Sequence, residues 1–472
     1  MRRKITSSIV FASLFLFSFS LTALERQSAS IYRARRVALS QKTTGGVVAL
    51  FAPVERPDEI FGFHQEANFY YLTGWIEPGA ALLIAPAVEA REGVAGQPYS
   101  EILFLPARNL AEEKWLGPKL GPGDTEVSKV TGFDRVEPLD KMHDELTAIL
   151  SSERAAIYSD LGSYNEESAS VEPLAWLRRG QAFAGGNGFQ DVKQLLAQLR
   201  TIKDSGEIDL VVKATHASMA GHLAALKAIH PGIAEREIQA LMQYEYQRRG
   251  CERSAYAPIV GSGFNSTVLH YSADSAMMRE GDVVVMDVAG EYSMYASDIT
   301  RTAPVNGHFT ARQREIYNIV LGAQHVAMQA FKAGVSRLRG RDADSLDRVA
   351  RDYIQSHGKD LHGESLGKYF IHGLGHYVGL DVHDLGDYGV PLDKGGSGLH
   401  QYGAWIFFRF LSEYFQDPTI IRDIWDEADV PAVMTALTRL AEEVLHTLLH
   451  VCAEPPPDAE APCVPSDDDA AR

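Results

Sequence analysis

Two acidic side chains beside apolar runs are the first candidates for chemistry in this chain of 472 residues. Asp287 closes the run Val283-Val284-Val285-Met286, and Asp298 opens a second run farther along. If these runs form paired strands, both carboxylates come to one end of a sheet. Two carboxylates held close together repel each other unless a cation lies between them. Aspartates in surface turns are the alternative, but the flanking apolar runs favour a metal site.

Three histidines follow within twelve residues, His372, His376 and His383. Three glycines lie among them, Gly373, Gly375 and Gly379, so this segment is expected to be loop or strand rather than helix. A single histidine is more often a hydrogen-bonded core residue, whereas a group of three favours a site. His270, within Leu269-His270-Tyr271, is ambiguous alone and gains weight only from this group. Carboxylates combined with imidazoles suit Mn, Co, Fe or Zn.

The first half of the chain predicts an α/β domain at about 30–190. A helix is expected at 30–42 and strands at 46–51, 80–85 and 101–106. The segment 61–74 is dense in aromatic residues, and we expect strand and packed loop there.

The second half, 195–395, predicts an α+β domain that carries the candidate site. Helices are expected at 195–226, 235–249, 317–331 and 342–357, and strands at 257–260, 267–271 and 282–290. A turn at 291–297 is expected to join the strand that ends near Asp287 to the one that begins at Asp298.

The N-terminus predicts an export signal at 1–23. Met1-Arg2-Arg3-Lys4 is basic, an apolar stretch runs from Ile9 to Leu21, and the small residue Ala23 marks a plausible cleavage point. The stretch is short and interrupted by serines, which counts against the alternative of a membrane anchor. We therefore expect an exported protein, periplasmic or secreted, with no membrane segment after signal cleavage. A formal net charge of −17 argues against a nucleic-acid partner.

The chain resembles the metallopeptidase family of Xaa-Pro aminopeptidases (aminopeptidase P) and prolidases. In the first half, the resemblance lies in Asn68-Phe69-Tyr70-Tyr71-Leu72-Thr73-Gly74 and in Glu77-Pro78-Gly79. In the second half, it lies in Met286-Asp287-Val288-Ala289-Gly290, in Asp298-Ile299-Thr300-Arg301-Thr302 and in the histidine segment 372–383. It implies an aminopeptidase P N-terminal-like domain followed by a pita-bread metallopeptidase domain.

The resemblance also implies roles for the candidate residues. Asp287 would bind one metal, Asp298 would bridge two, and His376 would bind the second. His270 and His383 would line the scissile peptide, and His372 would shape the pocket for proline at the second substrate position. The implied activity is release of the N-terminal residue from such peptides. The implied cofactor is divalent, with manganese favoured, the partner is a proline-containing peptide, and a homo-oligomer is possible.

The sequence departs from the family after about Gly395. The family uses two further glutamates, one of them in a Glu-Pro-Gly segment, and 396–405 contains no glutamate. The next glutamates, Glu413 and Glu427, stand in unrelated contexts. We therefore expect an incomplete pita-bread domain, a divergent helical segment at 396–452 and a disordered acidic tail at 453–472. With two glutamates missing, we expect one metal or none and impaired activity.

Three alternatives stay open. The chain could be a prolidase that cuts Xaa-Pro dipeptides, or a non-catalytic binding protein on the pita-bread scaffold. An amidinohydrolase of the creatinase type shares this scaffold, but it does not call for the metal-binding set retained here.

Overall fold

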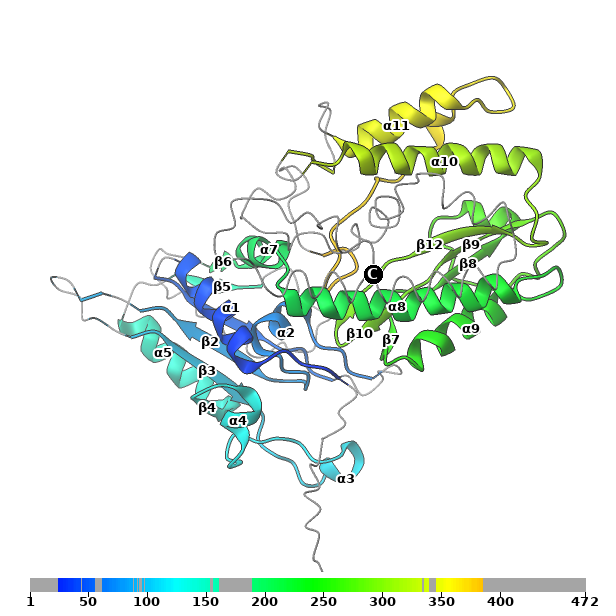
Figure 1. Cartoon of the computed structure of the whole chain (residues 1–472). Helices are drawn as coiled ribbons and strands as arrows, with labels where there is room; N and C mark the ends of the chain where they lie inside the picture. The colour runs from blue at the N-terminus through cyan, green and yellow to red at the C-terminus, as the bar shows by residue number, and fades with distance from the viewer. Residues whose placement is uncertain are drawn as a thin grey trace, which may run out of the picture.

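The computed structural model describes residues 24–384, apart from 44, 56–61, 88, 91, 93–95, 97, 153–155, 161–188, 333–334 and 339–344. The predicted export signal and the predicted segments after 384 therefore lie outside the described residues. Figure 1 shows the N-terminal part, in blue and cyan, beside the second part, in green and yellow.

A mixed six-stranded sheet forms the N-terminal part, with strand order β4-β3-β2-β1-β5-β6. Its strands are β1 (Val47–Phe51), β2 (Ala81–Ala85), β3 (Ser100–Leu105), β4 (Val136–Pro138), β5 (Ile157–Ser159) and β6 (Phe189–Asp191). The β1–β2 and β2–β3 pairs are antiparallel, and the other three pairs are parallel. The strands expected at 46–51, 80–85 and 101–106 are thus confirmed.

Both faces of this sheet are buried, which explains why its strands are continuously apolar. Val48 and Leu50 belong to one hydrophobic cluster, whereas Val47, Ala49 and Phe51 belong to another. Helix α1 (Ala29–Lys42) adds Leu39 to the first cluster, and α5 (Met142–Ser152) adds Met142 and Leu146 to the second. Shorter helical segments are α3 (Glu113–Leu116), α4 (Val127–Thr131) and η1 (Leu139–Lys141).

The expectation of strand and packed loop at 61–74 is wrong for its second half, which forms helix α2 (Ala67–Thr73). The Glu66 carboxylate caps this helix by accepting hydrogen bonds from the Asn68 and Phe69 amides, and Gly74 ends it with a φ of 63°. The aromatic residues favour strand locally, but here all seven residues of the helix are buried. Tertiary packing therefore overrides local propensity.

The second part begins with α7 (Lys193–Thr201), α8 (Ser205–Ala228) and α9 (Glu235–Gln247). Two three-stranded antiparallel sheets follow, ordered β12-β9-β8 and β11-β10-β7. Their strands are β7 (Arg253–Ser254), β8 (Ile259–Ser262), β9 (Val283–Asp287), β10 (Gly290–Tyr292), β11 (Tyr295–Ala296) and β12 (Thr300–Pro304). Helices α8 and α9 pack against β8 and β9 through a shared hydrophobic cluster.

Two helices complete the described fold. Helix α10 (Ala311–Ala330) packs against α11 (Leu346–His357) through Ile319, Ala323, Ala350 and Ile354. A short 3₁₀ segment, η3 (Leu366–Tyr369), leads into the histidine loop (Figure 1). No helix among the described residues is long and apolar enough to cross a bilayer.

Three expectations for the second part are wrong. The range 195–226 is not one helix but two, α7 and α8, because Asp204 caps a new helix after the break at 202–204. The strand expected at 267–271 is absent, and the 3₁₀ segment η2 (Gly263–Thr267) and a turn stand in its region. Side-chain bonds within this segment, such as Ser266 Oγ to the Gly263 carbonyl, favour the turn over strand pairing. The interval 291–297 is a hairpin of β10 and β11 rather than a simple turn, and Ser293 and Met294 at its tip have positive φ.

Candidate metal centre

Strand pairing brings the two predicted aspartates together. Strand β9 ends at Asp287, whose register partner on β12 is Thr300, so Asp298 lies just beyond the paired end. The Tyr256 hydroxyl donates hydrogen bonds to Asp287 Oδ1 at 2.5 Å and to Asp298 Oδ1 at 3.3 Å. The expectation that both carboxylates meet at one end of a sheet is therefore confirmed.

The surroundings of Asp287 and Tyr256 shift the pKa values of both groups. Burial raises the pKa of Asp287, the hydrogen bond from Tyr256 opposes that rise, and the charge of Asp298 adds to it. Burial, followed by the charges of Asp287 and Asp298, also raises the pKa of Tyr256 well above its usual range. Tyr256 consequently remains a hydroxyl donor at any ordinary pH.

His376 connects the carboxylates to the histidine loop. Its Nε2 lies 2.9 Å from Asp298 Oδ2, and its Nδ1 lies 2.9 Å from the Tyr377 carbonyl oxygen. Because a carbonyl only accepts, Nδ1 carries the proton, and Nε2 can offer its lone pair to a cation when the ring is neutral. Burial lowers the pKa of His376, but the hydrogen bond to Asp298, the backbone bonds to Tyr377 and Val382 and the charge of Asp298 together outweigh this effect, so the pKa is raised overall.

His383 completes a compact group with Asp298 and His376. One possible ligand atom from each of the three lies within 4.8 Å of those of the other two. The two imidazole rings lie with their centroids 4.2 Å apart. Burial and then the neighbouring His376 lower the pKa of His383, which favours the neutral ring. A carboxylate and two imidazoles form a donor set that fits a divalent transition metal.

His270 and His372 lie at the edge of this group. Charges on both residues contribute to lowering the pKa of His383, and His270 also lowers that of Asp287. His372 is exposed, and its Nδ1 donates to the Gly373 carbonyl at 2.8 Å. All six residues singled out from the sequence thus lie on one region of the fold, with Asp298, His376 and His383 closest together. The separate roles expected for them remain predictions.

Tyr256 is the site residue that sequence reasoning missed. It stands in a short irregular stretch before β8, and a lone tyrosine there carries no motif. Ile259 on β8 pairs with Asp287 on β9, so knowledge of the strand register would have placed residues just before Ile259 near the carboxylates. The two further family glutamates sought after 384, and the candidates Glu413 and Glu427, lie outside the described residues.

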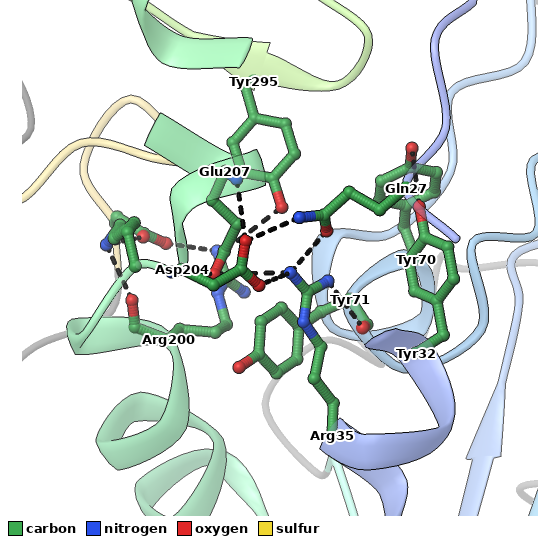
Figure 2. Close-up of polar contacts among 11 residues, drawn as sticks. Gln27, Tyr32, Arg35, Tyr70, Tyr71, Arg200, Asp204, Glu207 and Tyr295 are labelled. Carbon is green, nitrogen blue, oxygen red and sulfur yellow. Dashed lines mark hydrogen bonds and ion pairs between the residues drawn. The ribbon is translucent and has the colours of Figure 1, made fainter. Parts of the chain in front are cut away.

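Charged residues at the end of α7 and just after it bond the end of the histidine loop. Asp384, which follows His383 directly, accepts hydrogen bonds from both Arg200 and Lys203. Asp204 caps α8 and pairs with Arg35 of α1 at 2.7 Å, and Glu207 of α8 accepts from the Tyr295 hydroxyl at 3.1 Å. Figure 2 shows Arg35 reaching across to Asp204 and Glu207, with Arg200 close to the same group of residues.

Comparisons with known proteins agree with this architecture. A model of metallopeptidase family M24 matches residues 209–398, and a model of the aminopeptidase P N-terminal domain matches residues 32–158. The Xaa-Pro aminopeptidase of Escherichia coli is 31% identical over 372 residues, which cover 76% of this chain and 81% of that protein. The human Xaa-Pro dipeptidase is 31% identical over 348 residues, which cover 70% and 66% respectively.

Solved structures give the same result. Aminopeptidase P from Escherichia coli, in a low-pH form, superposes with a TM-score of 0.65 at 28% identity, covering 77% of this chain and 83% of that chain. Proline aminopeptidase P II from Yersinia pestis gives a TM-score of 0.63 at 30% identity, covering 77% and 84%. The α/β N-terminal domain followed by a pita-bread domain, expected from the sequence, is confirmed.

Proposed function

Because the chain belongs to metallopeptidase family M24, we propose that it is an Xaa-Pro aminopeptidase, which releases the first residue from peptides with proline in second position. One observation carries the proposal: Asp298, His376 and His383 converge within 4.8 Å, beside Asp287 and Tyr256. The Xaa-Pro aminopeptidase named among the relatives supports the substrate class.

The protein side chains have distinct tasks in this proposal. A divalent cation, when bound, lowers the pKa of a coordinated water molecule and polarises the scissile carbonyl. Asp287, Asp298 and His376 would hold the cation, and Tyr256, which bonds both aspartates, would keep them oriented towards it. His270 and His383 would donate hydrogen bonds to the substrate carbonyl or to the leaving nitrogen. That nitrogen carries no hydrogen in an Xaa-Pro bond, so substrate recognition has to rely on other contacts.

The substrate assay compares an Xaa-Pro-Xaa tripeptide, an Xaa-Ala-Xaa tripeptide and an Xaa-Pro dipeptide, each with added Mn²⁺. We expect release of the first residue from the Xaa-Pro-Xaa tripeptide alone. In the same assay, Asp298→Asn should lower kcat/KM by more than about 100-fold, since it alters a direct ligand. Cleavage of the dipeptide alone would identify a prolidase, the activity named for the human relative. No cleavage together with no Mn²⁺ binding would favour a non-catalytic binding protein.

For the metal itself, we propose one manganese ion per chain. Asp287, Asp298 and His376, the ligands proposed above, are three in number, which is sufficient for one cation. A second cation nearby would need more bridging anions to offset the repulsion, and the stretch 396–405 contains no glutamate. Metal analysis of the purified protein after Mn²⁺ loading should give about one ion per chain; two ions would show that further ligands exist.

Export is also part of the proposal, because 1–23 has a basic start followed by a short apolar stretch. N-terminal sequencing of the mature protein should begin near Leu24. A protein that retains Met1 and fractionates with the cytoplasm would contradict this.

A further inference from the structure

The segment between α7 and α8 contacts the histidine loop directly. Arg200, at the end of α7, donates from Nη2 to Asp381 Oδ2 at 2.6 Å and also to Asp384 Oδ1. Lys203 donates from Nζ to Asp384 Oδ2 at 2.6 Å. Both cations and Asp384 are almost fully buried, with exposed fractions of 1%, 4% and 3%. Asp384 therefore has a cation on each of its carboxylate oxygens, and it is the neighbour of His383.

The histidine loop has other anchors besides Asp384: the Leu374 amide donates to Asp347 Oδ1 at 3.0 Å, and Val378 and Leu380 are buried in the first hydrophobic cluster. Residues 371–384 form neither helix nor strand, so regular backbone pairing does not hold them. Backbone bonds add to this: the Asp384 amide donates to the Tyr377 carbonyl, the Gly379 amide donates to the Asp381 carbonyl, and the Ala296 amide of β11 donates to the Gly379 carbonyl. Gly379 packs so closely on Asp384 that a Cβ there would lie 2.3 Å from Oδ2. The carboxylate of Asp384 therefore packs against the Gly379 backbone and connects the loop to Arg200 and Lys203.

The N-terminal domain holds the other side of this segment. Arg200 donates from Nη1 to Asn68 Oδ1 at 2.6 Å, and Asn68 Nδ2 donates to Asp160 at 2.6 Å. Asn68 lies on α2, the helix that the sequence pattern failed to predict. Arg35 of α1 pairs with Asp204 at the start of α8, as Figure 2 shows. Direct contacts therefore connect Asn68 of α2 to Arg200, and Arg200 to Asp384. His383 is the residue that precedes Asp384 in the chain.

We propose that Arg200 and Lys203 are positioning residues of the metal centre. Through Asp384 they hold His376 and His383 over Asp298, and Asn68 makes the N-terminal domain a structural part of that centre. In this proposal both cations act through Asp384, which they bond directly. A buried charge pair that loses one member leaves the other charge unpaired, so removal of either cation should displace the Asp384 carboxylate and the loop that it organises. The consequence for catalysis rests on the proposed function, whereas the consequence for the loop does not.

The test uses Lys203→Met in the full chain, because Arg200 remains in place to support folding. Lys203→Arg is the conservative variant, and Lys213→Met on α8 is the matched control. Lys213 pairs with Glu25 at 2.6 Å in a half-exposed position, away from the loop. Asn68→Ser, which removes the side-chain amide that bonds Arg200, tests the contribution of the N-terminal domain.

Two readouts separate positioning from general destabilisation. Hydrogen exchange of the Gly379 and Asp384 amides should become about 10-fold faster in Lys203→Met, while amides of β9 and β12 keep their rates. The dissociation constant for Mn²⁺, titrated into metal-free protein, should rise about 10- to 100-fold in Lys203→Met, and less in Asn68→Ser. Lys203→Arg should recover most of both effects, and Lys213→Met should show neither.

The outcomes are distinct. Equal acceleration of exchange in the loop and in both strands, or an unchanged loop, would overturn the proposal. If the wild-type protein neither binds Mn²⁺ nor cleaves Xaa-Pro peptides, the proposed function fails, and hydrogen exchange still decides whether Lys203 positions the loop.

Discussion

Removing the Tyr256 hydroxyl tests whether its hydrogen bonds orient the Asp287 and Asp298 carboxylates for metal binding. Tyr256→Phe deletes the donor shared by Asp287 and Asp298, at 2.5 and 3.3 Å, and leaves the ring in place. A hydrogen bond to a charged group contributes about 1.5–3 kcal/mol. If the bond orients the carboxylates for the cation, its loss corresponds to roughly 10- to 100-fold weaker Mn²⁺ binding, the usual range for a group that orients a metal ligand.

The assay is a titration of metal-free protein with Mn²⁺ at constant pH, followed by kcat/KM on an Xaa-Pro-Xaa tripeptide. Tyr292→Phe is the matched control, because its hydroxyl bonds Glu25 at 3.3 Å in an exposed position. The control should bind Mn²⁺ as the wild type does. A Tyr256→Phe protein whose Mn²⁺ affinity stays within about twofold of wild type, or increases, would refute the idea that this hydroxyl orients the ligands.

Three further predictions concern other parts of the fold. Glu235 accepts hydrogen bonds from the Ser262 and Ala276 amides, which flank the segment bearing His270, so Glu235→Gln should lower kcat about 10-fold, measured at saturating tripeptide. Burial lowers the pKa of His222 to about 4, so the folded state favours the neutral ring. The free energy of unfolding that this contributes is fully present above pH 6.5 and should fall by about 3 kcal/mol towards pH 4. Denaturant unfolding of His222→Phe should lack this slope. Gly379→Ala should speed exchange of the loop amides, whereas a loop that exchanges as in wild type would show that it tolerates the added methyl.

The positions of Asp287 and Asp298 could be predicted because they depend on the residues next to them in the sequence. The run Val283–Met286 specifies a buried strand, and strand pairing places whatever follows at the sheet end. The glycines among the histidines predicted loop or strand rather than helix, and the structure shows a loop there. In both cases, residue type and spacing were sufficient, and the structure confirms the expected positions.

The missed features depend on contacts between distant residues. The helix α2 forms from residues that favour strand, because burial and the Glu66 cap decide its conformation. Tyr256 lies near the aspartates because the β8–β9 register pairs Ile259 with Asp287, and no sequence motif predicts that register. The hairpin at 290–296 depends on positive φ at Ser293 and Met294, two residues that do not usually adopt it. The family resemblance could name site residues, but it says nothing about what supports them.

The two halves of the centre are therefore supported in different ways. The carboxylates stand on a hydrogen-bonded sheet, whereas the histidines stand on a loop one of whose anchors, Arg200, is 184 residues away from Asp384 in sequence. Arg200 is itself held by Asn68 of the N-terminal domain. Without that domain, Arg200 would lose Asn68, and the buried carboxylate of Glu207 would lose Arg35, its partner at 3.3 Å. Uncompensated buried charges are strongly destabilising, so the second domain on its own should keep its sheet before it keeps its histidine loop.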